Sequence, residues 1–263
     1  MQRTRFVKSP EEVDRLLSAY ARPDFLDIHS LAVTFDTDPE VVRELLPPPL
    51  EPSHEARISI SVYEVRRSSC VGPFNGSSVN IACRYGGEEG LYCLAMPMNT
   101  DTAIIFGREL YAEPKKLAEI ALSTRPGHAH GTVMRHGVTY IELDGHFEDE
   151  PAEVGRESLT KHYYFKYLPA ANGAGLAADP ELVCVTHRGL THRAVRGTGS
   201  ITFRESRHDP VIDIPVWSVT GASLSESETH TTAEVVARVP AATFLPYAFA
   251  KSDDYTAWSA ETC

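Results

Sequence analysis

The feature that most constrains the fold is an alternation of apolar and polar residues with a period of two. It runs through Arg57-Ile-Ser-Ile-Ser-Val-Tyr-Glu-Val65 and returns in four later segments, residues 131–143, 182–187, 199–203 and 232–239. Such alternation is typical of strands that bury one face and expose the other. Helical patterns do not separate these segments regularly, as they would in a parallel sheet of βαβ units. The sequence therefore predicts an α+β, β-dominated fold, with a largely antiparallel sheet or barrel and flanking helices.

Two short helices are predicted outside the strands. Ser9-Pro10-Glu11-Glu12 combines a capping serine, a proline at the first helical position and a glutamate three residues after the serine, so it predicts a helical N-terminal segment over residues 9–20. Asp38-Pro39 opens a second helix, which the prolines at 47–49 must end because proline offers no amide donor. Neither a repeat nor a linker divides the chain, so we expect one domain over residues 1–263.

Charge and cysteine usage narrow the class of protein. The 36 acidic residues outnumber the 25 basic ones and give a net charge of −11, which opposes binding to nucleic acid or to an anionic membrane. No apolar run approaches the roughly 18 residues of a membrane span, and none follows the charged start, so we expect a cytoplasmic protein. The five cysteines fit neither a zinc site nor a dense disulfide framework and are interpreted as reduced thiols.

Lysine is rare in this chain, yet Lys115 and Lys116 are adjacent and follow Pro114 directly behind an apolar run. Only a neutral amine attacks a carbonyl, and an ordinary lysine, with a pKa of about 10.4, is almost entirely charged at pH 7. Burial together with a neighbouring ammonium can lower the lysine pKa by the roughly 3 to 4 units required. The alternative interpretation is an exposed basic dipeptide that opens a helix.

The surroundings of these lysines favour the reactive interpretation. Gly107-Arg-Glu-Leu110 followed by Pro114-Lys-Lys-Leu117 resembles the signature of the acetoacetate decarboxylase family. The resemblance extends over roughly residues 25 to 250. Its further landmarks occur in family order and are Phe35-Asp-Thr-Asp38, Leu46-Pro-Pro-Pro-Leu50, Gly90-Leu-Tyr92, Tyr164-Phe-Lys-Tyr-Leu-Pro169 and Asp209-Pro-Val-Ile-Asp-Ile-Pro-Val216.

This resemblance implies a homo-oligomer whose subunits carry a closed antiparallel β-barrel or cone with the reactive lysine facing an apolar interior. It implies that Lys115 forms a Schiff base and that Lys116 is its adjacent partner, with Arg108 and Glu109 of the signature assigned to substrate binding. The implied ligand is a small carbonyl or keto-acid substrate, and the implied chemistry needs no cofactor.

Two departures from the family pattern predict a divergent member. Gly76 stands where the family decarboxylases carry a glutamate, and Ile28 stands where they carry an arginine that receives the substrate carboxylate. Glu113 is a candidate replacement acid or base, and its alternative is a surface glutamate. His29 is a candidate anion ligand or proton shuttle, or else a hydrogen-bonded structural histidine. Neutral hydrogen bonds are available from Asn75, Ser77 and Ser78, which are otherwise turn residues.

Two other motifs are candidates for a metal site and for a phosphate-binding loop, and neither meets the requirements. His128-Ala-His130 places two imidazoles on one face of a strand, but no third ligand occurs at a firm spacing, so the sequence assigns no metal. Gly197-Thr-Gly-Ser200 is too short for a phosphate loop and precedes a strand instead of a helix, and is interpreted as a hairpin turn.

The leading functional hypothesis is a cofactor-independent lyase that decarboxylates a keto acid, or acts on a related carbonyl compound, through an imine on Lys115. An aldolase, dehydratase or cyclase reaction can follow from the same imine. A protein that binds a carbonyl ligand without turning it over is the alternative from another functional class.

Overall fold

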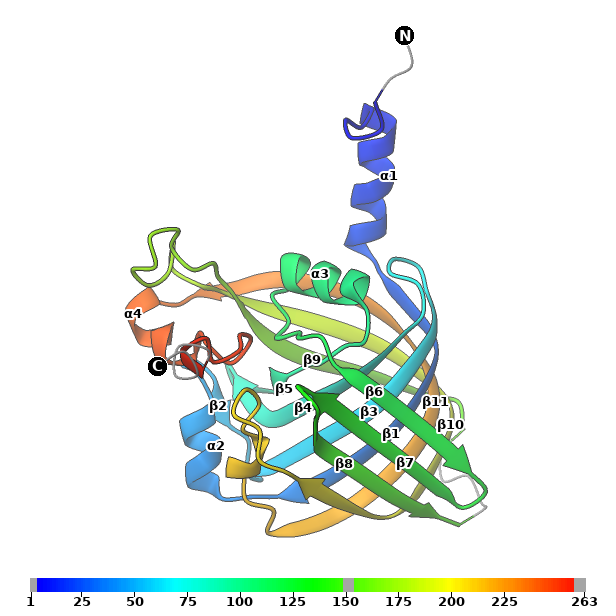
Figure 1. Cartoon of the computed structure of the whole chain (residues 1–263). Coiled ribbons are helices and arrows are strands. Elements are labelled where there is room, and N and C mark those ends of the chain that lie inside the picture. The colour runs from blue at the N-terminus through cyan, green and yellow to red at the C-terminus, as the bar shows by residue number, and fades with distance from the viewer. Residues whose placement is uncertain (1–3, 149–153, 258–263) are drawn as a thin grey trace.

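The structure is a computed structural model that describes residues 4–148 and 154–257. Within these residues one 11-stranded sheet dominates the fold, and a few short helices lie around it (Figure 1). The strands are β1 (Asp24–Asp36), β2 (Glu51–Pro52), β3 (Arg57–Ser68), β4 (Phe74–Tyr85), β5 (Glu88–Ala95), β6 (Glu119–Arg125), β7 (His128–Arg135), β8 (Val138–Phe147), β9 (Arg156–Lys166), β10 (Glu181–Phe203) and β11 (Ser218–Arg238). The helices are α1 (Pro10–Ala21), α2 (Pro39–Leu45), α3 (Asp101–Leu110) and α4 (Ala241–Phe244), with 3₁₀ turns η1 (Val211–Asp213) and η2 (Leu245–Tyr247). The predicted β-dominated α+β class is confirmed.

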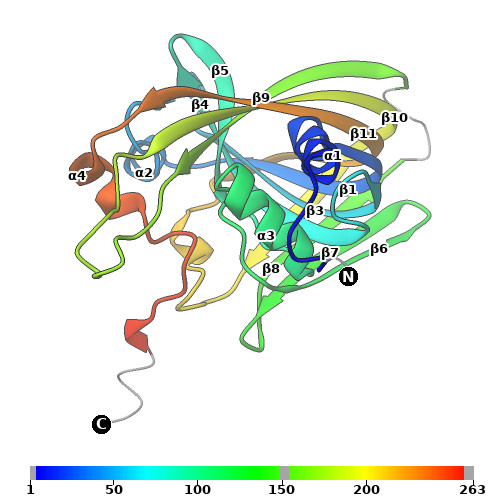
Figure 2. The same ribbon diagram turned by 90° about the horizontal axis from the view of Figure 1, so that it is seen from above.

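Seven of the strands form a closed circuit of hydrogen-bonded neighbours. The order is β11-β1-β3-β4-β5-β9-β10, and β10 also pairs with β11. Strands β8, β7 and β6 continue from β10 as a branch. Most ladders are antiparallel, as the alternating pattern predicts, but β5 and β9 are parallel where Leu91 and Tyr92 meet His162 and Tyr163. The strands thus curve around an interior instead of forming a flat layer (Figures 1 and 2).

The predicted strands at 182–187 and 199–203 are one continuous strand, β10, so the interpretation of Gly197 to Ser200 as a hairpin turn is wrong. A Cβ on Gly197 would lie 1.9 Å from the carbonyl oxygen of His146, and one on Gly199 would lie 2.8 Å from the Cβ of Ala222. The two glycines therefore permit a close approach of neighbouring strands, which is the other common use of glycine within a strand.

The predicted strand over residues 131–143 is a hairpin of β7 and β8. Its two-residue turn consists of His136 and Gly137, with φ angles of 50° and 76°. Turns of this kind require positive φ at both central residues and are usually marked by Asn-Gly or Asp-Gly. Histidine is an unusual first residue, so the pattern alone does not reveal the turn.

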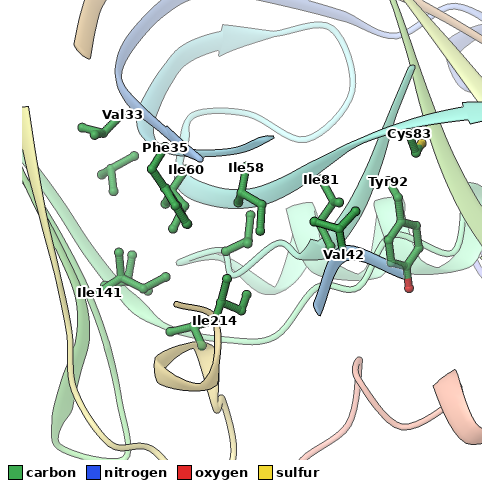
Figure 3. Close-up of a cluster of buried hydrophobic side chains, with 14 of the residues drawn as sticks. Val33, Phe35, Val42, Ile58, Ile60, Ile81, Cys83, Tyr92, Ile141 and Ile214 are labelled. Atoms are coloured by element: carbon green, nitrogen blue, oxygen red, sulfur yellow. The ribbon is translucent and has the colours of Figure 1, made fainter. Parts of the chain in front are cut away.

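Alternate residues of the strands face the main apolar core. On β1 these are Leu31, Val33 and Phe35, which are fully buried, while the intervening residues are partly exposed. Figure 3 shows Val33, Phe35 and Ile60 close to Ile141 on the opposite wall of this core. A second, smaller cluster includes Val65, Phe74, Met96, Met98 and Tyr164. This second cluster surrounds the candidate site described below.

The helices differ in how they contact the sheet. Helix α1 has the predicted capping box between Ser9 and Glu12, buries no residue, and projects away from the sheet (Figure 1). Helix α2 ends at Leu45, before the prolines, as predicted. Helix α3 lies across one end of the curved sheet (Figure 2), with Ala103 and Gly107 buried. No helix in residues 4–148 and 154–257 is long and apolar enough to cross a membrane.

The cysteines within the described residues are free thiols, as expected. Cys83, Cys93 and Cys184 are buried and Cys70 is partly exposed. Cys263 lies outside the described residues.

Candidate active site

The chain after α3 runs extended past the segment that follows β5. The amides of Met96 and Met98 donate to the carbonyls of Pro114 and Lys116 at 3.1 and 2.9 Å. The amide of Ala118 returns to the carbonyl of Met98 at 2.8 Å. Successive side chains of an extended chain point to opposite faces. Lys115 and Lys116 therefore diverge although they are adjacent in sequence.

The side chain of Lys115 is buried beside a carboxylate. Only 5% of the residue is exposed, and its Nζ lies 2.7 Å from Oε2 of Glu113. The amine also donates to the carbonyl of Ala103 in α3, at 3.1 Å. Glu113 is itself only 8% exposed, so its interpretation as a surface glutamate is wrong. The two residues form a buried pair that can exchange a proton directly.

The glycine of the Gly-Arg-Glu-Leu motif explains how this pair approaches the helix. A Cβ on Gly107 would lie 1.9 Å from Oε2 of Glu113 and 2.4 Å from Nζ of Lys115. Any side chain at this position would displace one of the two charged groups. The glycine of the motif is therefore required for the pair to pack against the buried face of α3.

Lys115 and Glu113 open into a cavity of about 470 Å³. One wall is apolar, and among the described lining residues Lys115 and Glu113 are the only lysine, arginine, aspartate or glutamate. Ile28 lies on this wall, where the family resemblance places an arginine. The cavity is lined by Phe25, Ile28, Ser30, Tyr63, Val65, Phe74, Ser78, Met96, Met98, Glu113, Lys115, Thr160, His162, Tyr164, His187, Ser225, Ser227 and Thr229.

Two tyrosines and two histidines add a polar but uncharged wall. Burial and the carboxylate of Glu113 raise the pKa of Tyr63 well above its usual value. Burial, with Cys93 and Glu113, does the same for the pKa of Tyr164, so both phenols keep their protons. Burial lowers the pKa of His162 to about 3 and that of His187 to about 4, so both imidazoles are neutral near pH 7.

Sequence reasoning missed these four residues. His162 and Tyr164 are two apart on β9, on the face that looks into the cavity. A signal was available for His162. Tyr164 already belonged to a family landmark, and the period of two along a strand places His162 on the same face as Tyr164. His187 on β10 and Tyr63 on β3 carry no local signal. Only the pairing of strands brings them together.

Tyr63 occupies the space beside Gly76. A Cβ on Gly76 would lie 2.6 Å from the Tyr63 ring and 2.8 Å from Sδ of Met98. A glutamate therefore does not fit at position 76 while Tyr63 holds this position. Where the family pattern has a glutamate, this chain thus has Gly76 with the ring of Tyr63 beside it, and Tyr63 lines the Lys115 cavity.

Lys116 points to the other side of the chain. Its Nζ donates to the carbonyl of His208 at 2.7 Å and to Oδ1 of Asp209 at 3.0 Å, and it lies 3.5 Å from Oδ1 of Asp253. Arg135 is bonded to the same two aspartates. This side borders a separate cavity of about 770 Å³. The described ion pairs of Lys116 all belong to this cluster, and its role as partner of Lys115 stays a prediction.

The two polar residues of the signature also lie outside the Lys115 cavity. The Arg108 guanidinium donates to the carbonyls of Lys115 and Lys251, each at 2.8 Å. It therefore braces the main chain that carries the amine. Glu109 is on the exposed face of α3. The structure gives neither residue a place in the cavity wall, and their substrate contacts stay predictions.

Of the other candidates, Ser78 lines the cavity, but the structure does not bring His29, Asn75 or Ser77 into its wall. His29 faces away from Ile28, lies 2.9 Å from Asp27 and 3.0 Å from Arg66, and borders another depression. The Asn75 side chain donates to the carbonyl of Ile120 at 3.1 Å. Ser77 is fully buried with no hydrogen-bond partner for its hydroxyl.

The histidines of β7 acquire partners from β8. His128 and His130 each lie 3.1 Å from Oδ1 of Asp144. Together with Glu142, His130 and Asp144 form a group whose potential ligand atoms lie within 4.8 Å of one another. Strand β8 thus supplies the further potential metal ligands that the sequence spacing did not reveal. Glu142, however, already forms an ion pair with Arg204. None of the three residues of this group lines the Lys115 cavity.

Comparison with known proteins relates this geometry to a family. The family model for acetoacetate decarboxylase matches residues 10–239. The acetoacetate decarboxylase of Burkholderia multivorans is 28% identical over 203 residues, which cover 75% of this chain and 81% of that protein. The crystal structure of acetoacetate decarboxylase from Legionella pneumophila has a TM-score of 0.76 at 19% identity, with 83% of this chain and 88% of that chain covered. The enduracididine biosynthesis enzyme MppR has a TM-score of 0.70 at 16% identity, covering 87% and 92%.

Proposed function

The chain belongs to the acetoacetate decarboxylase family, and from that premise we propose that it is a Schiff-base lyase whose nucleophile is Lys115. Its enzyme class, a decarboxylase or related lyase, is that of the family. The single observation that carries the assignment of Lys115 is its buried amine, 2.7 Å from a buried carboxylate in a largely apolar cavity.

The proposed reaction begins with proton transfer within the pair. Glu113 takes a proton from the Lys115 ammonium, and the neutral amine attacks the substrate carbonyl carbon. The carbinolamine then loses water, with Glu113 returning the proton to the leaving hydroxyl. The product is a protonated imine between Nζ and the substrate carbon.

The imine accepts the electrons of the bond that breaks. In a β-keto acid, the bond to the carboxylate carbon breaks, carbon dioxide leaves, and the electron pair forms an enamine that ends on the nitrogen. Protonation of the enamine carbon regenerates the imine, and water then releases the ketone and the free amine. No step requires a cofactor.

An aldol-type reaction is the second candidate, and a specific observation favours it. The described lining residues include no arginine to receive a carboxylate. In addition, MppR has been solved in complex with the condensation product of pyruvate and imidazole 4-carboxaldehyde. In an aldol cleavage, a base removes the β-hydroxyl proton, the carbon–carbon bond breaks, and the same enamine forms as an aldehyde leaves.

The experiment that tests the proposal is borohydride trapping with a panel of ketones and keto acids. Reduction of the imine adds the mass of the ligand to the chain, and peptide mapping locates it. We expect the adduct on Lys115. An adduct on Lys161 or Lys166 would overturn the assignment. Binding without an adduct or turnover would support a non-catalytic carbonyl-ligand protein instead.

Acetoacetate itself is expected to be a poor substrate. Gly76 and Ile28 provide no charge where the family decarboxylases provide it, and Tyr63 occupies the space beside Gly76. Carbon dioxide release from acetoacetate should therefore be much slower than turnover of a larger carbonyl compound. Release at a comparable rate would restore the simple family activity.

A further inference from the structure

The polar wall of the Lys115 cavity contains two buried polar atoms that have no partner. They are the hydroxyl of Tyr164 and Nδ1 of His162, and both residues line the cavity. Tyr164 is only 1% exposed, and the two rings stack with centroids 6.4 Å apart. Buried polar atoms of folded proteins are nearly always hydrogen-bonded, so such a pair in a cavity wall indicates a site for a ligand atom.

His187, the other histidine of this wall, has a hydrogen-bond partner for its Nδ1 atom. Nδ1 of His187 lies 3.0 Å from the hydroxyl of Thr231, and its ring meets that of His162 edge to face at 4.9 Å. His187 thus holds the His162 ring in place from β10. The unpartnered atoms are confined to the adjacent strand β9, two residues apart on one face.

The chemistry of these two atoms selects an uncharged oxygen. The Tyr164 phenol keeps its proton and donates, while neutral His162 accepts or donates at Nδ1 according to its tautomer. A substrate hydroxyl can accept from the phenol and donate to the imidazole. A carbonyl oxygen can accept from both.

A carboxylate has no charged partner at Tyr164 or at neutral His162. Among the described lining residues Lys115 is the only lysine or arginine, and the protonated imine keeps its charge on the nitrogen that is bonded to the reacting carbon. The other charged group is Glu113, which repels a second carboxylate and, with burial, contributes to keeping the nearby phenols protonated.

We infer that the substrate carries, besides the carbonyl that reacts with Lys115, a second and uncharged oxygen, a hydroxyl or a carbonyl, which the Tyr164 hydroxyl and His162 Nδ1 bind. This inference rests on the proposed imine at Lys115. It makes Tyr164 and His162 determinants of specificity. It also accounts for the apolar wall of Phe25, Ile28 and Phe74, which suits the body of a larger carbonyl compound.

The test compares two probes that differ by one oxygen. The probes are 4-hydroxy-4-phenylbutan-2-one and 4-phenylbutan-2-one, whose affinities are measured by calorimetry without borohydride. Because aldol cleavage of the hydroxy ketone would release benzaldehyde, benzaldehyde absorbance is followed in the same samples and the heat of any turnover is subtracted. One neutral hydrogen bond corresponds to a preference of up to about tenfold. We expect the hydroxy ketone to bind the wild-type protein about tenfold more tightly, and acetoacetate to compete with it weakly.

Tyr164→Phe removes only the phenol oxygen and should bring the two affinities to near parity. Its melting temperature in the absence of ligand should not fall, because the hydroxyl has no partner to lose. Tyr163→Phe is the matched control. Tyr163 is equally buried at 1% exposure, adjacent on β9, and packs with Tyr85 on the opposite face. This control should retain the full preference.

Parity of the two ketones in the wild-type protein would overturn the inference. So would a preference that survives in Tyr164→Phe, or acetoacetate that binds as tightly as the hydroxy ketone. Borohydride trapping of the same samples tests the imine separately. If the hydroxy ketone binds more tightly but no borohydride adduct forms on Lys115, the proposed role of Lys115 is rejected and the oxygen site is kept. If the adduct forms but the two ketones bind equally, the oxygen site is rejected and the role of Lys115 is kept.

Discussion

The two adjacent lysines occupy opposite environments. Lys115 has one carboxylate, Glu113, and faces a cavity in which no other described lysine or arginine takes part. Lys116 has two carboxylates, Asp209 and Asp253, which it shares with Arg135. A single base beside an amine suits proton transfer, whereas two cations and two anions that compensate each other suit a structural cluster. Adjacency in sequence thus yields one candidate nucleophile and one residue that joins the chain to the C-terminal segment.

The largest expected effect comes from removing the amine on the cavity side. Lys115→Arg keeps a positive charge beside Glu113 but supplies a guanidinium that stays protonated and cannot form the imine. Turnover should fall by at least about 10,000-fold, and the borohydride adduct should disappear. Intact mass measurement and steady-state kinetics provide the check. If activity survives Lys115→Arg, Lys115 is not the nucleophile, and the functional difference between Lys115 and Lys116 is rejected.

The next effect tests the carboxylate that accompanies Lys115. Glu113→Gln retains the size of the side chain but cannot accept the proton, and a general base contributes about 100- to 10,000-fold. Where proton transfer limits the rate, turnover should fall at least about 100-fold, while slow trapping still reaches one adduct per chain. Glu119→Gln, at an exposed position of β6, is the matched control and should change turnover less than about threefold. A similarly small change in Glu113→Gln would reject its role.

On the other side, Lys116→Ala should act mainly on stability. It leaves Asp209 and Asp253 with Arg135 alone, and breaking a buried ion pair typically costs about 3 to 5 kcal/mol. Because Asp253 is partly exposed and Arg135 remains, we expect a loss of about 2 to 4 kcal/mol in urea unfolding. Turnover should weaken, and the adduct at Lys115 should still form. Full loss of the adduct with unchanged stability would show that Lys116 acts on the amine.

The smallest expected effect is a pH dependence specific to the cavity side. Burial, with His187 nearby, lowers the pKa of His162 to about 3. The unfolded chain binds a proton at this residue below about pH 6.5 and the folded chain does not, so His162 removes stability as the pH falls from 6.5 towards 3. His162→Phe should therefore reduce the stability lost between pH 7 and pH 5 by about 1 to 2 kcal/mol. Unfolding curves at the two pH values measure this, and an unchanged difference would show that His162 is protonated in the folded chain.

The sequence by itself determined the local elements of this protein. The capping box of Ser9 and Glu12 and the prolines at 47–49 set helix ends, and the period of two placed β3, because these signals act between near neighbours. The resemblance of the Pro-Lys-Lys segment to the family signature made Lys115 the predicted nucleophile. The sequence did not reveal that residues 181–203 are one strand, because the glycines at 197 and 199 serve contacts with distant strands instead of a turn.

The tertiary structure alone decided which side chains meet. The two lysines separate because the segment is extended and pairs with residues 96–98, a register that no local pattern encodes. Tyr63, His162 and His187 come from three strands far apart in the sequence and meet only when the sheet curves back on itself. Gly107 is required because α3 packs directly on the Lys115–Glu113 pair. A site assembled across strands depends on long-range pairing and curvature, so its membership is a property of the fold and not of any segment.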